Sequence, residues 1–184
     1  MQYKPGHYYH VYNKAVGGQL LFREHNDYQF FISRIEKRIM DSGIRMIACC
    51  LMPNHYHLLL GQQGTFTIGQ FLRSVVQSYS QYYNKRYSKR GRVFESLPAP
   101  KEVDNHEYLI TLCTYIHLNP VRAGLVSEVE NWPYSNYHEF VGRRNSELIE
   151  RTIVSEWFNS PEEYEQYIAD LSEENKKKIK KYLF

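Results

Sequence analysis

The chain has 184 residues, which suits one domain or one domain with a helical appendage. Hydrophobic residues make up 42% of it, enough for a core, and this excludes disorder of the whole chain. No apolar run reaches the roughly 18 residues that a membrane helix needs, so no membrane contact is expected. The odd count of three cysteines and the lack of an apolar signal region at the start predict a cytoplasmic protein with reduced thiols.

Charge divides the sequence into two parts. Residues 1–144 carry 17 Lys/Arg against 11 Asp/Glu, whereas residues 145–184 carry 6 against 9. A basic body is compatible with a polyanionic partner, and its many tyrosines can stack on bases. The sequence therefore predicts a main domain over 1–144 and a charged helical C-terminal tail over 145–184.

The first third of the chain predicts a strand, a helix and a hairpin. Asn26 or Asp27 is the expected N-cap of the helix, and Pro53-Asn54 is the expected turn of the hairpin. The expected ranges are a strand over 7–16, a helix over 27–41 and two strands over 44–52 and 55–60.

The middle of the chain predicts two helices with an extended segment between them. Thr65 or Thr67 caps the first helix, which carries a 3.6-residue apolar stripe from Ile68 to Tyr79. Residues 92–103 look extended, but Pro98 and Pro100 argue against a central strand there. The second helix is expected to start at Asp104 or Asn105 and to end before Pro120. This order predicts an α+β, ferredoxin-like (RRM-like) antiparallel sheet with helices on one face.

The pair His55 and His57 is the first candidate for chemistry. Residues i and i+2 of a strand face the same way, roughly 6.6–6.8 Å apart, so both imidazoles can converge on one cation. The alternative is a hairpin with two exposed histidines. The apolar run Leu58-Leu59-Leu60 and the turn at Pro53-Asn54 favour a rigid ligand pair.

Tyr115 and Asn119 form the second candidate. They are i and i+4 on the expected helix and therefore lie one above the other at the rim of the core. The amide oxygen of Asn119 suits a hard cation such as Mg²⁺ or Mn²⁺. The alternative is that Tyr115 packs at the core margin and that Asn119 merely ends the helix. His117 is a rival ligand, but it points about 200° away from Tyr115 on the helix.

The other histidines lack a neighbour at ligand spacing and are expected to be surface or structural residues; they are His7, His10, His25, His106 and His138. A third candidate is the basic run over 82–92, in which tyrosines alternate with cations that can bind DNA phosphates. A solvated helix end is the alternative for this run. Its cations are Lys85, Arg86, Lys89, Arg90 and Arg92. No glycine-rich phosphate loop is present, so no nucleotide cofactor is expected.

Two long segments resemble a known family. Residues 50–60, which contain Pro53-Asn54-His55-Tyr56-His57, resemble the His-hydrophobic-His segment of the HUH-type tyrosine transposases. Residues 115–126, from Tyr115 through Asn119-Pro120 and Arg122, resemble the nucleophile helix of their REP-associated branch. Residues 9–13 and 132–137 also match, so the resemblance covers roughly 7–140. The chain departs from the family at 96–100, Ser-Leu-Pro-Ala-Pro, where a basic and aromatic stretch is usual.

The resemblance implies a metal-dependent enzyme that cuts single-stranded DNA near hairpins. Carried over, His55 and His57 bind Mg²⁺ or Mn²⁺, Asn119 supplies a further ligand, and Tyr115 attacks to give a 5′-phosphotyrosine link. Arg122 joins the basic run as an expected DNA contact. A monomer or a homodimer is compatible with this activity.

Two alternatives stay open at the level of the sequence. A catalytically retired relative would still bind hairpin DNA without cutting it. An RNA-binding protein could use a similar sheet, but its usual aromatic and basic sheet motif is not evident, and the histidine pair would be unexplained.

Overall fold

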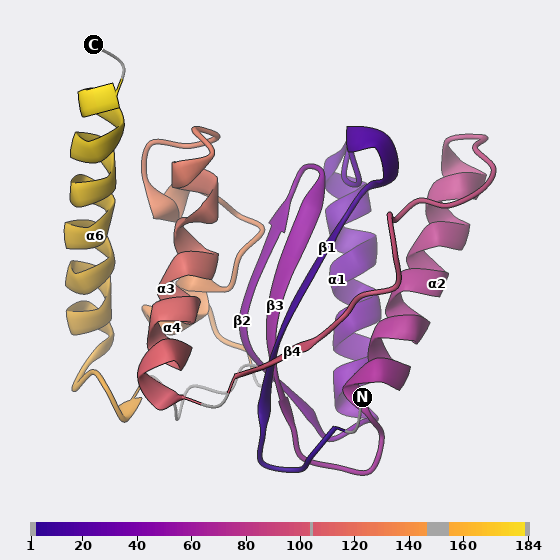
Figure 1. Cartoon of the computed structure of the whole chain (residues 1–184), viewed down its shortest axis with the longest axis horizontal. Coiled ribbons are helices and arrows are strands. Elements are labelled where there is room, and N and C mark those ends of the chain that lie inside the picture. Colours follow the sequence, from indigo (N-terminus) through magenta and orange to yellow (C-terminus); the bar gives the residue numbers. More distant parts are fainter. Residues whose placement is uncertain (1–2, 104, 147–154, 183–184) are drawn as a thin grey trace.

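A four-stranded antiparallel sheet with strand order β2-β3-β1-β4 forms the centre of the computed structural model, which describes residues 3–103, 105–146 and 155–182 (Figure 1). The strands are β1 (Tyr8–Lys14), β2 (Ile44–Met52), β3 (His55–Gln62) and β4 (Lys101–Val103). The predicted α+β class and the predicted hairpin are confirmed. The segment with the two prolines contributes only the short edge strand β4, as expected.

Helices α1 (His25–Met40) and α2 (Ile68–Arg86) cover one face of this sheet (Figure 1). Alternate residues of β1 and β3 point toward these helices, among them Tyr9, Tyr56 and Leu58, which are fully buried. They meet an apolar stripe that includes Phe31 and Phe71. Together these residues form the first of two cores.

The opposite face is covered as well, by α3 (His106–Arg122), and α6 (Pro161–Tyr182) packs on α3 from outside (Figure 1). Leu59 of β3 shares a second buried cluster with Cys113 and Ile116 of α3, and Tyr164 and Ile168 of α6 extend this cluster behind α3. The sequence predicted helices on one face of the sheet. This is right for α1 and α2, but α3 packs on the other face, so the prediction of a single covered face is wrong. The physical reason is that β2 and β3 are apolar on both faces and must be covered on both.

Shorter elements close the remaining edge. The turns η1 (Val16–Gly18) and η2 (Val129–Asn131) and the short α4 (Tyr137–Phe140) link the main elements. The Asn136 side chain accepts from Cys49 N and donates to Ile47 O, so it satisfies the outer edge of β2. In the described part of the chain, none of the helices has the length and hydropathy to cross a bilayer.

Helix boundaries confirm some predicted caps and correct others. Thr67 and Asn105 cap α2 and α3 as expected, while Asp104 lies outside the described residues. The N-cap of α1 is Glu24, and Asp27 at the third helical position completes a capping box with it. The predicted N-caps Asn26 and Asp27 were therefore wrong.

Helix α3 does not stop before Pro120 but runs to Arg122. A proline in the last turn costs one backbone hydrogen bond. The bonding then resumes with Ala123 N to Asn119 O and Leu125 N to Pro120 O. This correction also removes the interpretation that Asn119 merely ends the helix.

The buried carboxylate of Asp27 joins α1 to the end of α2. It accepts from the backbone N–H groups of Arg23 and Glu24, and from the Tyr82 and Tyr87 hydroxyls at 3.0 and 2.6 Å. The Arg86 guanidinium of α2 lies 3.6 Å from the same carboxylate and 2.7 Å from Glu24. Arg86 is therefore part of a structural network.

We expect Asp27→Ala to lower the free energy of unfolding by about 3 kcal/mol, because it leaves several backbone N–H and tyrosine hydroxyl donors without their acceptor. Urea denaturation followed by circular dichroism measures this loss. Asp41→Ala, an exposed site at the end of the same helix, is the control and should change stability by less than about 0.5 kcal/mol. Equal stability of the two variants would refute the structural role of Asp27.

Candidate active site

The histidine pair lies at the start of β3, immediately after the turn at Pro53-Asn54. Strand alternation turns Tyr56 into the core against Phe31, with ring centres 5.0 Å apart, and sends His55 and His57 to the opposite face. The two imidazole rings have centres 5.2 Å apart and are nearly perpendicular. His57 is 5% exposed, and His55 is only half-buried.

Burial keeps both imidazoles neutral. Desolvation lowers the pKa of His57 to about 3, with smaller contributions from the neighbouring His10 and His55. Desolvation also lowers the pKa of His55 below its usual value. A neutral imidazole offers a lone pair, which is the form that binds a metal ion.

A third histidine belongs to this cluster. His10 of β1 lies with its Nε2 atom 3.1 Å from Nδ1 of His57, and the two rings are nearly parallel. Burial, together with Lys101, lowers the pKa of His10. The prediction that His10 has no neighbouring ligand was wrong, because the contact depends on the pairing of β1 with β3, in which Tyr12 lies opposite His57. The alternation Tyr8-His10-Tyr12 in the sequence is the signal that places His10 on this face.

Helix α3 brings Tyr115 to the histidine pair. The Tyr115 ring stands perpendicular to the His57 ring, with centres 5.6 Å apart, and its side chain is 36% exposed. The guanidinium carbon of Arg122, two turns along the helix, lies 5.1 Å from the Tyr115 ring centre. Asn119 lies between them on the same helix face, and its Nδ2 donates to the Tyr115 carbonyl at 3.0 Å. The predicted histidine pair, the predicted Tyr115–Asn119 pair and Arg122 therefore lie in one part of the structure.

His117 is excluded from the site by its surroundings. It is fully buried; its Nε2 donates to Asn136 Oδ1 at 3.0 Å, and its Nδ1 accepts from the Tyr164 hydroxyl at 2.7 Å. The rival ligand is therefore a connector between α3, α6 and the segment that borders β2.

The side chains available as metal ligands are neutral, and they can bind a divalent cation. Two neutral imidazoles and the Asn119 amide oxygen supply no negative charge, and the residues that the structure describes contain no cluster of three or more His, Cys, Asp or Glu arranged for a metal. Imidazole ligands suit Fe, Ni, Cu and Zn, whereas the amide oxygen of Asn119 suits Mg²⁺ and Mn²⁺. Negative ligands would have to come from outside the protein, and phosphate oxygens are the obvious source.

The basic run lies on the far side of the sheet from Tyr115. It occupies the end of α2 and the following loop, whereas α3 packs on the other face (Figure 1). Lys85, Lys89, Arg90 and Arg92 are exposed. Both Arg122 and this run lie toward the end of the sheet where β3 begins, so a strand that contacts both must pass over that end.

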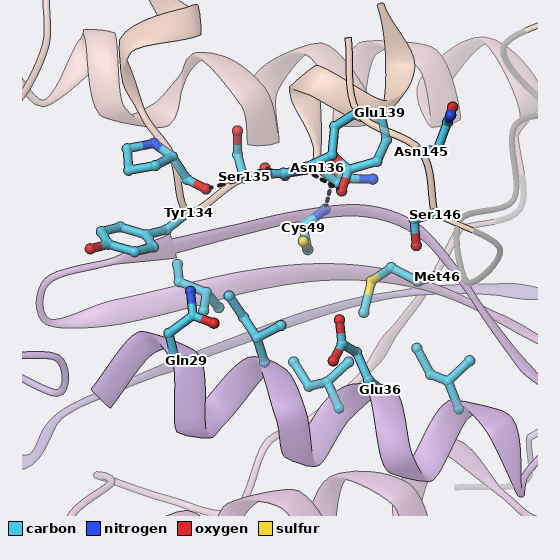
Figure 2. A pocket seen from close by; sticks show the side chains of 16 residues that line it. Gln29, Glu36, Met46, Cys49, Tyr134, Ser135, Asn136, Glu139, Asn145 and Ser146 are labelled. Carbon is cyan, nitrogen blue, oxygen red and sulfur yellow. Dashed lines mark hydrogen bonds and ion pairs between the residues drawn. The ribbon is translucent and has the colours of Figure 1, made fainter. Parts of the chain in front are cut away.

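A cavity of about 290 Å³ lies elsewhere, between α1 and the segment 133–146 (Figure 2). Figure 2 shows Glu36 and Glu139 on its opposite walls, with Cys49 between them. Burial, and then the charge of Glu139, raise the pKa of Glu36. None of the predicted site residues lines this cavity, so it lies apart from the candidate site.

Comparisons with known proteins identify the family of the chain. Residues 5–119 match the family described as "Transposase IS200 like", and the chain belongs to that family.

Two curated relatives are similar to part of the chain. A putative REP-associated tyrosine transposase of Haemophilus influenzae is 32% identical over 111 residues, which cover 52% of this chain and 60% of that protein. A REP-associated tyrosine transposase of Escherichia coli is 25% identical over 118 residues, which cover 63% and 68%. The match thus spans less than two thirds of the first relative.

One solved structure has the same fold. It is a REP-associated tyrosine transposase bound to a REP hairpin, with a TM-score of 0.67, 18% identity, and coverage of 82% of this chain and 95% of that one. The likeness confirms the α+β sheet architecture.

The buried His117 predicts a pH dependence of stability. Burial lowers its pKa to about 4 in the folded protein, so the unfolded chain binds an extra proton below pH about 6.5. Its contribution is complete above that pH and is lost as the pH falls toward 4, by at most ~1.4 kcal/mol per pH unit. We expect His117→Gln to flatten the fall in unfolding free energy between pH 6.5 and 4. An unaltered slope in His117→Gln would contradict the assignment.

Proposed function

We propose that the protein is a divalent-metal-dependent, single-strand DNA transesterase that acts beside DNA hairpins. The observation that carries the proposal is the exposed Tyr115 hydroxyl on a helix that packs its ring against His57, the buried member of a neutral imidazole pair. A nucleophile next to metal ligands, on the margin of a basic body, is the arrangement that phosphate-ester chemistry requires.

His55, His57 and Asn119 would hold the metal, which when bound draws charge from the scissile phosphate and orients it for in-line attack. Tyr115 supplies the attacking oxygen. Its bond to phosphorus forms as the bond to the 3′ oxygen breaks, which leaves a 5′-phosphotyrosine and a free 3′-OH. The positive charge of Arg122, next to the Tyr115 ring, attracts the same phosphate. Because the phosphotyrosine ester keeps the energy of the cleaved phosphodiester bond, the 3′-OH of a DNA strand can later attack it and reverse the step without a nucleotide cofactor.

The partner is single-stranded or hairpin DNA. Lys85, Lys89, Arg90 and Arg92 are exposed and supply phosphate contacts on one side of the sheet end, and Arg122 does so on the other. Arg86 contributes less than the sequence suggests, because Glu24 and Asp27 already neutralise it. RNA binding through an open sheet face is disfavoured, because α3 packs on the face opposite α1 and α2.

The nucleophile is tested with Tyr115→Phe, which removes one oxygen and keeps the ring. We expect no covalent adduct when this variant is incubated with labelled hairpin DNA and Mn²⁺ and run on a denaturing gel, while DNA binding is retained. Tyr12→Phe is the matched control, since Tyr12 is also exposed and its ring centre lies 5.0 Å from that of His57. An adduct formed by Tyr115→Phe but lost in Tyr12→Phe would move the nucleophile to Tyr12.

The metal site is tested by binding and by cleavage. Because the proposed protein ligands are neutral, we expect Mn²⁺ to bind more tightly, by about ten-fold or more, when hairpin DNA is present, and we expect Mn²⁺ or Mg²⁺ to support cleavage. His55→Ala and His57→Ala should each abolish cleavage, and Asn119→Ala should weaken it less. Cleavage that persists in EDTA, or an equal Mn²⁺ affinity with and without DNA, would overturn the metal assignment.

The DNA contacts are tested by charge reversal that spares Arg86. Converting Lys85, Lys89 and Arg90 to glutamate should weaken hairpin binding and reduce its salt dependence, because fewer counterions are released. Reversal of three cations in the less basic α1 and β2, Lys37, Arg38 and Arg45, is the control. An equal loss in both triple variants would mean that only net charge matters.

A further inference from the structure

We propose that Asn54 and His10 are positioning residues that fix the tautomers of His55 and His57, so that both histidines present Nε2 to the metal. The inference rests on the proposed metal site and adds to it the atoms that bind and the residues that select them.

The His55 ring is held from the hairpin turn. Its Nδ1 atom lies 2.7 Å from Oδ1 of Asn54, the residue just before it. An amide oxygen can only accept, so Nδ1 carries the proton and donates it. The lone pair of the neutral ring is then on Nε2, at the opposite side of the imidazole, which leaves that atom available to a cation.

The His57 ring is held from the neighbouring strand. Its Nδ1 atom meets Nε2 of His10 at 3.1 Å, so one of the two nitrogens must carry a proton. If the proton were on His10, the neutral His57 would carry its own proton on Nε2, and neither nitrogen of the ring could bind a metal. Metal binding by His57 therefore requires the Nδ1–H form, with His10 as the acceptor.

The surroundings make His10 a selective partner. β1 and β3 are paired so that Tyr12 lies opposite His57, and the Tyr12 ring covers the His57 ring at a centre distance of 5.0 Å. His57 is thus enclosed by His10, Tyr12 and Tyr115, with 5% of its surface exposed. Water has little access to replace a lost partner, so removal of His10 should release the tautomer of His57.

Partners of this kind matter because a histidine ligand that donates its second N–H is oriented and made more basic. Loss of such a partner typically costs 10–100-fold in metal affinity. Asn54 and His10 touch neither the substrate phosphate nor the reacting oxygen in this account. They act only through His55 and His57.

The tautomers can be read in the metal-free protein with long-range ¹H–¹⁵N correlation spectra of the imidazoles. We expect His55 and His57 of the full chain to be protonated at Nδ1 and bare at Nε2. In His10→Phe, the His57 signals should shift toward the Nε2–H form, and the Mn²⁺ affinity should fall about 10–100-fold. His10→Gln, which returns an acceptor oxygen, should recover part of both. His138→Gln is the control and should change neither.

The inference is overturned if His57 is protonated at Nε2 in the unaltered protein, or if His10→Phe changes neither tautomer nor affinity. A metal-induced ¹⁵N shift on His10 itself with Zn²⁺ as probe would make it a ligand and also refute the positioning role. Should His10→Phe fail to fold, Asn54→Ala against Asn54→Asp tests the same idea for His55 at an exposed turn, with Asp expected to keep the wild-type tautomer.

Failure of the proposed function gives a different pattern. Tautomers and Mn²⁺ affinity that respond as expected, in a protein that forms no DNA adduct, would support the positioning residues and refute the cleavage activity. DNA cleavage with tautomers indifferent to His10 and Asn54 would do the reverse.

Discussion

The alternation of side chains along β3 is the constraint on which the rest of the structure depends. Tyr56 is fully buried against α1, and this anchor fixes the strand so that His55 and His57 must emerge on the other face. A slip of one residue would turn the imidazoles toward α1 and Tyr56 toward the face on which α3 packs. The short turn before the strand and the apolar run after it hold this register and fix the backbone that carries His55 and His57.

The second requirement is a helix that faces that pair, and a polar link sets its place. His117 connects α3 to Tyr164 of α6 and to Asn136, whose amide in turn satisfies the edge of β2. Rotation of α3 about its axis would break this chain of buried hydrogen bonds. Tyr115 is therefore held against His57 by residues that take no part in the chemistry, and α6 belongs to the scaffold of the site.

Local sequence patterns predicted most helices and strands. The features that they did not predict depend on contacts between residues far apart in the sequence. Period-two and period-3.6 patterns predicted the hairpin, helix α3 and the caps Thr67 and Asn105. They could not place α3 on the second face, because the same apolar runs suit one covered face or two. His10 was missed since its role depends on the register of β1 with β3. The structural role of Arg86 was also missed, because it depends on the carboxylate of Asp27, about sixty residues away in the sequence.

In the proposed reaction, the Tyr115 side chain supplies the oxygen atom that links the protein to DNA. The most direct test is mass spectrometry of the protein after incubation with Mn²⁺ and a hairpin that carries a single-stranded flank, followed by nuclease and trypsin digestion. Cleavage after Lys101 and Arg122 isolates Tyr115 from the exposed Tyr12. The account predicts a 5′-linked nucleotide on the peptide 102–122, localised to Tyr115 by fragmentation. A nucleotide on the peptide that holds Tyr12, or on another tyrosine, would contradict it.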